Sequence, residues 1–305
     1  MPEDFRSIGR RLSNWGRWGK DDERGTTNFI TPECVKAAAQ LIRTGRVFDL
    51  GIPFASDGPQ PGGTRMNPML LISETGVDQN FPGAFHYADD YIFMPLQAAS
   101  QWDSLAHVHY DGKLYNGFPA TDVTPHGAHH CSIDKQGRGI TGRGVLLDVA
   151  RLRGVKWMEM GELITPEELD VAAKAHKVEI RSGDILLIRT GWRRKFVEER
   201  NAVEWNKGEP GIGLACCDWL AKHEVAVVCC DNIAVEVLPG EVPDEILPVH
   251  MVLLRDMGMT LGEILDFEEL SEDCARDGVY EFFFCGPPIK FARALGSPIN
   301  PLAIK

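Results

Sequence analysis

Polar side chains that could bind a metal ion or move protons are concentrated in the segment 97–110, which reads QAASQWDSLAHVHY. Its chemically active members all occupy odd positions, namely Gln97, Gln101, Asp103, His107 and His109. Alternate side chains of a β-strand share one face, so an extended strand would align all five. Two amides, a carboxylate and an imidazole form a donor set that suits a divalent metal ion. The alternative is a polar strand face with a structural histidine.

The spacing of these residues sets a condition on the backbone. At about 3.3 Å per residue, a straight strand would separate Gln97 from His107 by roughly 33 Å, too far to share one ion. A single helix also fails, because at about 100° per residue Gln97 and Gln101 point about 120° away from Asp103 and His107. The chain must therefore turn near Asp103 if the four side chains converge. A helical i,i+4 relation between Asp103 and His107 is one geometry that would bring them together.

Two further features are weaker candidates. His250 and Glu263 flank an apolar segment that closes near Gly258, in LPVHMVLLRDMGMTLGEIL. A core histidine and a solvated glutamate are the ordinary interpretation of such a pair. Asp231 follows an apolar strand, at the position where α/β folds tend to bind ligands, although a strand-end cap explains it equally well.

An aromatic and basic cluster near the N-terminus, NWGRWGK, contains Arg17 and Trp18 and could form a substrate lid or an interface patch. We include both residues, with Trp102 and His109, among the candidate substrate-binding residues.

Composition excludes several classes of protein. The 305 residues are 44% hydrophobic and 25% charged, which is typical of a soluble globular protein. Acidic residues outnumber basic ones by 44 to 32, and a net charge of −12 disfavours binding to nucleic acid or to anionic membranes. The apolar runs are too short to cross a bilayer, and the N-terminal segment has no signal-peptide pattern, so we expect a cytoplasmic protein. The eight cysteines are expected to be reduced and mostly buried.

Helix and strand patterns alternate along the chain, which favours an α/β fold. Helices are expected over 31–43, 165–176 and 211–223, the first two beginning with a Thr-Pro capping signal. Strands are expected over 47–50, 144–148, 184–189 and 225–230. The Pro/Gly-rich stretch 56–68 is expected to be a loop. We interpret 1–305 as one domain, with 1–44 as an N-terminal extension that holds the Trp/Arg-rich segment and a helix.

Several of these segments together resemble the cyclase family of metal-dependent hydrolases. The family hallmark H-x-G-T-H-x-D-x-P-x-H aligns with QAASQWDSLAH, from Gln97 to His107. The similarity extends in order over about residues 45–285. It includes TGRGVLLDVARLRG, ITPEELD with GDILLIRTGW, VVCCDNIAVE and PVHMVLLRDMGMTLGEIL. The resemblance implies a kynurenine formamidase-like swivelling β/β/α fold, with a mixed, barrel-like sheet packed by helices.

This sequence departs from the hallmark at four positions. Gln97 and Gln101 replace its first two histidines, while Ser100 and Leu105 replace its threonine and proline. The two glutamines are similar to the trans-dienelactone hydrolase branch of the family. An amide oxygen suits a hard ion, so Mn²⁺ stands beside Zn²⁺ as the expected metal, with Mg²⁺ as a further candidate.

The resemblance implies roles for individual residues. Gln97, Gln101, Asp103 and His107 would bind the metal, while His107, His250 and Glu263 would act in catalysis. The expected reaction is hydrolysis of a lactone, a cyclic amide or imide, or an N-formyl amide. The alternatives are a metal-dependent lyase or cyclase, and a non-catalytic binding protein derived from the family.

The expected partners are a small-molecule substrate and further copies of the chain, in a homodimer or homotetramer. A substrate carboxylate would require an arginine, for which the candidates are Arg17, Arg24, Arg65 and Arg189.

Overall fold

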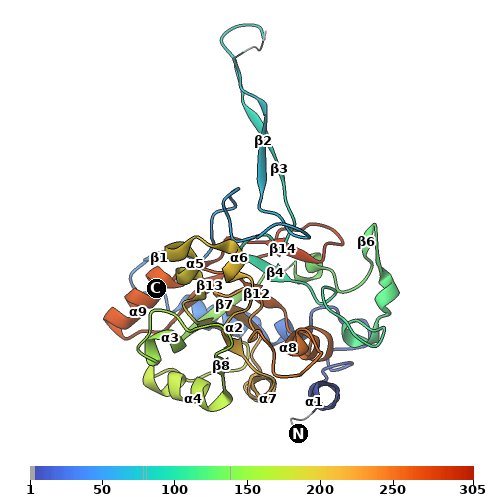
Figure 1. Cartoon of the computed structure of the whole chain (residues 1–305), viewed down its shortest axis with the longest axis vertical. Helices are drawn as coiled ribbons and strands as arrows, with labels where there is room; N and C mark the ends of the chain where they lie inside the picture. The colour runs from blue at the N-terminus through green and yellow to red at the C-terminus, as the bar shows by residue number, and fades with distance from the viewer. Residues whose placement is uncertain (1–3, 78, 80, 138) are drawn as a thin grey trace.

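A nine-stranded mixed sheet lies at the centre of the computed structural model, which describes residues 4–77, 79, 81–137 and 139–305 (Figure 1). The order of strands across the sheet is β1-β15-β13-β7-β9-β11-β12-β4-β14. Strands β7, β9, β11 and β12 run parallel, and the outer strands pair antiparallel. The bounds are β1 (Val47–Asp49), β4 (Gln101–Asp103), β7 (Thr141–Asp148), β9 (Ile185–Arg189), β11 (Val227–Cys230), β12 (Leu261–Glu263), β13 (Glu281–Cys285), β14 (Gly296–Pro298) and β15 (Leu302–Ile304).

The connection between the last two strands shows that the sheet is curled. β15 is second in the order and β14 is last, yet only residues 299–301 separate them in the chain. A flat sheet would place them roughly 34 Å apart, whereas the connection reaches at most about 14 Å. The two ends of the sheet must therefore approach each other. This confirms the predicted α/β fold with a mixed, barrel-like sheet.

Helices surround the sheet, and its central strands are buried on both faces. On β7, Val145 and Leu147 belong to one apolar cluster while Leu146 belongs to another. This alternation explains why the strand is a nearly continuous apolar run. The helices are α1 (Phe5–Leu12), α2 (Pro32–Ala39), α3 (Val149–Leu152), α4 (Pro166–Ala175), α5 (Trp192–Glu199), α6 (Ala202–Trp205), α7 (Ala215–Lys222), α8 (Pro248–His250) and α9 (Glu268–Asp277), with a π-helix, η5 (Met251–Met257).

The capping signals place the helix starts correctly. The Thr165 hydroxyl accepts a hydrogen bond from the amide of Glu168 at the start of α4, and Thr31 does the same for Cys34 in α2. Helix α2 ends at Ala39, four residues before the predicted end. Helix α7 begins later than predicted, because the segment Gly211–Ile212 forms a strand, β10, beside β8 (Leu163–Ile164). The remaining short elements are β5 (Val123–Thr124), β6 (Gly127–Ala128), η1 (Gly25–Phe29), η2 (Tyr115–Gly117), η3 (Ala120–Asp122) and η4 (Ile133–Gln136).

The N-terminal segment packs on the body of the molecule. Phe5 and Ile8 of α1 are buried, and the indole N–H of Trp15 donates to the carbonyl oxygen of Arg255 at 2.8 Å. All eight cysteines are free, and six of them are buried, as expected. Among the described residues, no helix combines the length and the apolar composition that crossing a bilayer requires.

An antiparallel ribbon of two strands, β2 (Met69–Glu74) and β3 (Asp89–Phe93), projects far from the body (Figure 1). We call the ribbon and its connecting tip, residues 69–93, the arm. The loop 56–68, which precedes it, contains no helix or strand, as predicted.

Candidate metal centre

Strands β4 and β12 bring together two polar segments that are far apart in the sequence. They pair antiparallel, with Gln101 opposite Glu263 and Trp102 opposite Gly262. Strand β4 is only three residues long, and the chain turns on both sides of it. The Ala98 amide donates to Pro95 before the strand, and the His107 amide donates to Ser104 after it. These turns confirm that the chain turns near Asp103, as the spacing of the polar residues requires if their side chains are to converge.

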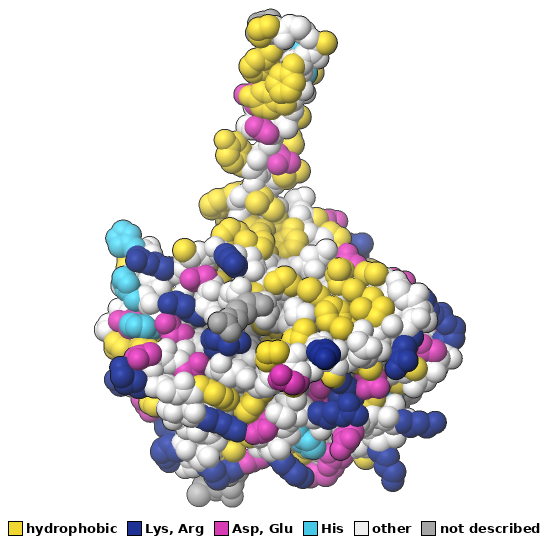
Figure 2. Space-filling model, turned by 180° about the vertical axis from the view of Figure 1, so that it is seen from behind, with side chains coloured by type: hydrophobic (Ala, Val, Ile, Leu, Met, Phe, Trp, Pro, Cys, Tyr) yellow, Lys and Arg dark blue, Asp and Glu magenta, His cyan; other side chains and the backbone are white. Residues whose placement is uncertain are grey.

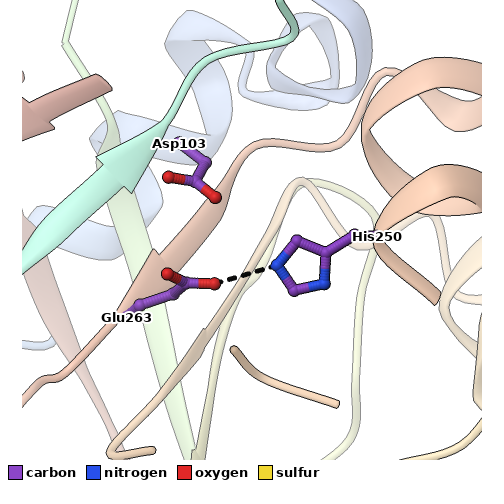
Figure 3. A group of neighbouring side chains, drawn as sticks. All are labelled: Asp103, His250 and Glu263. Atoms are coloured by element: carbon purple, nitrogen blue, oxygen red, sulfur yellow. Dashed lines mark hydrogen bonds and ion pairs between the residues drawn. The ribbon is translucent and has the colours of Figure 1, made fainter. Parts of the chain in front are cut away.

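Asp103, His250 and Glu263 form a buried cluster (Figure 3). One potential ligand atom from each lies within 4.8 Å of the others. His250 Nε2 lies 3.0 Å from a Glu263 oxygen, and the Gln101 amide donates to the other Glu263 oxygen at 2.6 Å. Asp103 Oδ1 and Gln101 Oε1 are buried without a hydrogen-bond partner. Buried polar atoms are rarely left unpaired, so these two oxygens are suited to binding a ligand.

Glu236 fixes the orientation of His250. One oxygen of its carboxylate lies 2.6 Å from His250 Nδ1 and accepts the His250 amide at 2.8 Å. Burial disfavours the imidazolium, but hydrogen bonds to Glu236 and Glu263 outweigh it and raise the pKa of His250 well above its usual value. A carboxylate that holds Nδ1–H leaves Nε2 directed at the cluster, which is the usual arrangement of a metal-binding histidine.

The cluster contains more buried carboxylates than cations. Burial, followed by the charge of Glu263, raises the pKa of Asp103 well above its usual value. Glu209 is also fully buried, and burial and the Glu263 charge raise its pKa well above its usual value, although the amides of Ile233 and Ala234 donate to its two oxygens. Several carboxylates so close together favour a cation between them. The donor set of Asp103, Glu263, His250 and Gln101 therefore fits a divalent metal ion.

Gln97 lies on the same side of the sheet as Asp103. Gly296 of β14 pairs with Asp103, and a Cβ at this glycine would lie 2.5 Å from Gln97 Nε2. Cross-strand partners project to one face, so the glycine provides the space in which the amide sits beside Asp103. The structure thus brings both glutamines of the predicted set toward the cluster.

His107 lies at the edge of the cluster, with 21% of its side chain exposed and Nε2 3.8 Å from Asp103 Oδ2. Its Nδ1 is buried and has no hydrogen-bond partner. Burial lowers the pKa of His107 to about 4, although the charge of Glu263 partly opposes this shift. His107 is therefore a neutral imidazole beside the cluster near pH 7.

The other candidate residues lie away from the cluster. Trp102 points to the opposite face of the sheet, where it is fully buried, and its indole N–H donates to Gly286 at 2.7 Å. Arg17 pairs with Glu224, which precedes β11, and its guanidinium stacks on Trp18. Glu263 is at the carboxyl end of the parallel neighbour β12, so Arg17 and Trp18 lie toward the opposite edge of the sheet.

His109 is exposed, and no hydrogen bond or ion pair links it to the cluster among the described residues. Trp102 is thus kept away from the cluster because its side chain points to the other face of the sheet. Arg17 and Trp18 are kept away because they lie at the other end of the parallel strands.

Sequence reasoning missed Glu236. For Asp231, at the end of β11, it left a ligand position and a strand-end cap equally open, and the structure decides for the cap, because Thr190 and Gly191 donate to its two carboxylate oxygens at 2.6–2.8 Å. Asp231 is therefore a structural cap. Glu236 follows five residues later in the apolar segment IAVEVL. An acidic residue inside an apolar stretch, just after a strand end, is the signal that could have identified it.

Known proteins place the chain in context. The family model described as "Putative cyclase" matches residues 48–237. The protein in a crystal structure described as a novel cyclase is 41% identical in sequence to this chain. The match covers 96% of this chain and 100% of that chain, with a TM-score of 0.89. No protein with curated annotation matches the chain.

More distant structures share the fold. Isatin hydrolase A from Ralstonia solanacearum is 18% identical, with 85% of this chain and 92% of that chain covered and a TM-score of 0.65. A predicted metal-dependent hydrolase from Bacillus stearothermophilus is 16% identical, with 86% and 98% covered and a TM-score of 0.53.

Proposed function

Because the chain belongs to the cyclase family, we propose that it is a metal-dependent hydrolase that opens small lactones, cyclic amides or imides, or cleaves N-formyl amides. The observation that carries this proposal is the buried Asp103–His250–Glu263 cluster, in which Asp103 Oδ1 has no hydrogen-bond partner. The similarity in fold to proteins named isatin hydrolase and metal-dependent hydrolase agrees with a hydrolytic reaction.

Asp103, Glu263 and His250 would hold the metal ion, and the amide oxygens of Gln101 and Gln97 would complete its surroundings. Zinc and manganese are the first candidates, and the two amides and two carboxylates also suit magnesium. The bound ion would lower the pKa of a water molecule toward neutrality and polarise the substrate carbonyl. Glu236 would keep His250 Nδ1 protonated, so that Nε2 always faces the ion.

His107 is placed to move the proton that hydrolysis requires. Its neutral imidazole lies at the partly exposed edge of the cluster, the side from which a substrate can approach. Nε2 would accept the proton of the attacking water and return it to the leaving alcohol or amine. We assign His107 this acid–base role and assign His250 and Glu263 to holding the ion.

Asp103→Asn tests the proposal, because it keeps the shape of the side chain and removes its charge. We expect the variant to lose bound metal, measured by elemental analysis, and at least about a thousandfold of its turnover on a panel of lactones, cyclic imides and N-formyl aromatics. Asp111→Asn, at an exposed aspartate of the same segment, is the matched control. Full metal content with unchanged turnover in Asp103→Asn would overturn the proposal.

Isotope incorporation separates hydrolysis from the lyase or cyclase alternative. A hydrolase places one oxygen of ¹⁸O-labelled water in the product acid, whereas a lyase or cyclase does not require water as the nucleophile. We expect one labelled oxygen per product. An unlabelled product would favour the lyase or cyclase, and full metal occupancy without turnover of any panel member would favour a binding protein.

A further inference from the structure

The arm exposes large apolar side chains along its whole length. Figure 2 shows hydrophobic side chains covering the arm and continuing onto the body at its root. At least half of each central side chain is exposed, and these residues are Leu70, Leu71, Ile72, Tyr91, Ile92 and Phe93. Soluble monomers rarely expose continuous apolar surface of this size, so the arm indicates an interaction surface.

Both faces of the arm are apolar. Leu70 pairs with Ile92, and Leu71 pairs with Tyr91. Successive pairs in an antiparallel ribbon project to opposite faces, so neither face is the polar one expected of a ribbon in water. Two strands alone are marginally stable in water. The arm is therefore expected to bind a partner that covers part of its apolar surface.

The tip of the arm carries three aromatic rings that pack on one another. The ring centroids of Phe81 and Phe85 are 5.7 Å apart, and Tyr87 lies 5.6 Å from Phe81 and 6.0 Å from Phe85. All three side chains are nevertheless exposed, Phe85 by 60%. This aromatic tip is an apolar protrusion without a counterpart in its own subunit among the described residues.

A matching apolar hollow of about 360 Å³ lies at the other end of the arm, where β3 enters the body. Residues from the arm root, from the segment after β13 and from β14 line it. They include Phe54, Ile92, Met94, Pro287, Ile289 and Pro298. One molecule thus carries an apolar protrusion at one end of the arm and an apolar hollow at the other.

We propose that the arm binds a second copy of this chain, with the two arms antiparallel and the aromatic tip of each in the root hollow of the other. A twofold axis through the middle of the paired arms exchanges tip and root. The interface is therefore isologous, and one subunit supplies both complementary parts. The apolar side chains of one arm then cover a face of the other.

Charge supports a protein partner over a lipid surface. The acidic residues Glu74, Asp89 and Asp90 lie where the paired strands end, near the middle of the arm and short of the aromatic tip. No lysine or arginine occurs between residues 66 and 112. An acidic arm without basic residues is poorly suited to anionic lipid.

The exposed apolar surface of the arm is also large enough for a dimer. Its large side chains offer on the order of 1,000 Å² per copy, close to the area that each partner contributes to a standard stable interface.

Analytical ultracentrifugation of the full chain and of two charge variants tests the proposal. Phe85→Asp disrupts the tip and Ile289→Asp disrupts the hollow, and each should raise the dissociation constant of the dimer by about 30-fold or more. Ile246→Asp is the matched control, because Ile246 is 82% exposed and lies outside the arm and the hollow. Phe85→Ser tests the same contact without adding charge.

Mixing the two charge variants tests the contact itself. Each variant alone has no intact tip-and-hollow contact, whereas a mixed dimer has one, between the Phe85 tip of one chain and the Ile289 hollow of the other. We expect the equimolar mixture to associate more tightly than either variant alone. A monomeric wild-type chain, unchanged association of Phe85→Asp and Phe85→Ser, or a mixture no tighter than its components would overturn the proposal.

Discussion

The candidate metal centre and the arm depart from ordinary protein architecture in opposite ways. The centre places carboxylates and unpaired amide and carboxylate oxygens in the interior, where polar groups are costly. The arm places aliphatic and aromatic side chains in solvent, where apolar surface is costly. Each region has a surplus that its own subunit does not balance. The kind of group in excess suggests the kind of ligand: excess buried negative charge suits a small cation, and excess exposed apolar area suits another protein surface.

Glu263→Gln should produce the largest effect and separate the two regions. The substitution removes the carboxylate nearest His250 Nε2, and we expect turnover to fall by about a thousandfold or more, because the ion's stabilisation of the transition state is several kcal/mol. Association of the chains should not change, since Glu263 is buried in the body. Steady-state kinetics and sedimentation on the same sample measure both properties. A change in association would show that the two regions are not independent.

Glu236→Gln should have a smaller effect on the same centre. Gln cannot hold His250 Nδ1 as a charged acceptor, so His250 loses its fixed orientation. We expect metal affinity to fall by about 10–100-fold, as is usual for a residue that orients a ligand. Metal titration under competition with a chelator measures this change. An affinity equal to that of the wild type would mean that Glu236 serves only to hold the backbone amides of Val249 and His250.

The fold could be predicted from the sequence because its signals are local. Apolar runs such as that of β7 report burial on both faces, and Thr-Pro pairs mark where helices begin. The pairing of β14 with β4 carries no such signal, because it depends on closure of the sheet at long range. Helix ends were less accurate than helix starts, since α2 lacks a strong stop signal at Ala39.

The centre could be predicted only in part. The odd-numbered polar residues and the resemblance to the family indicated Gln101, Asp103, His250 and Glu263, which the structure brings together. Glu236 was missed because its role depends on where the chain returns after β11. For the arm, the sequence predicted only the loop 56–68 that precedes it. The projection of the arm away from the body could not be predicted, because its apolar residues resemble those of a buried strand and only the tertiary structure shows that they are exposed.

Arg65→Gln addresses the substrate, on the side of the centre nearest the arm. Of the four candidate arginines, Arg189 is paired with Asp148 and Arg17 with Glu224, and Arg24 donates to the carbonyl oxygen of Thr27. The charge of Arg65 reaches both Asp103 and His107, and the described residues offer it no ion-pair partner. We expect KM for substrates that carry a carboxylate to rise about tenfold in the variant, while neutral substrates change little.

A paired comparison of charged and neutral lactones measures the effect of Arg65, with Arg181→Gln, at an exposed arginine, as the matched control. Equal changes for both lactones would remove Arg65 from substrate recognition.

Metal addition should stabilise the body by the same amount whether or not the arm is paired. This is the smallest expected effect, because we expect no difference in stabilisation between chains with paired and unpaired arms. An ion present at 100 times its dissociation constant contributes about 2.7 kcal/mol, and this should raise Tm by about 5 °C in a chain of this size. The centre is buried on β4 and β12, away from the arm tip, so Phe85→Asp should show the same increase as the wild type. Thermal unfolding with manganese or zinc, and with a chelator as the reference, measures both values at equal subunit concentration. A clearly smaller increase in Phe85→Asp would mean that pairing of the arms helps to form the metal centre.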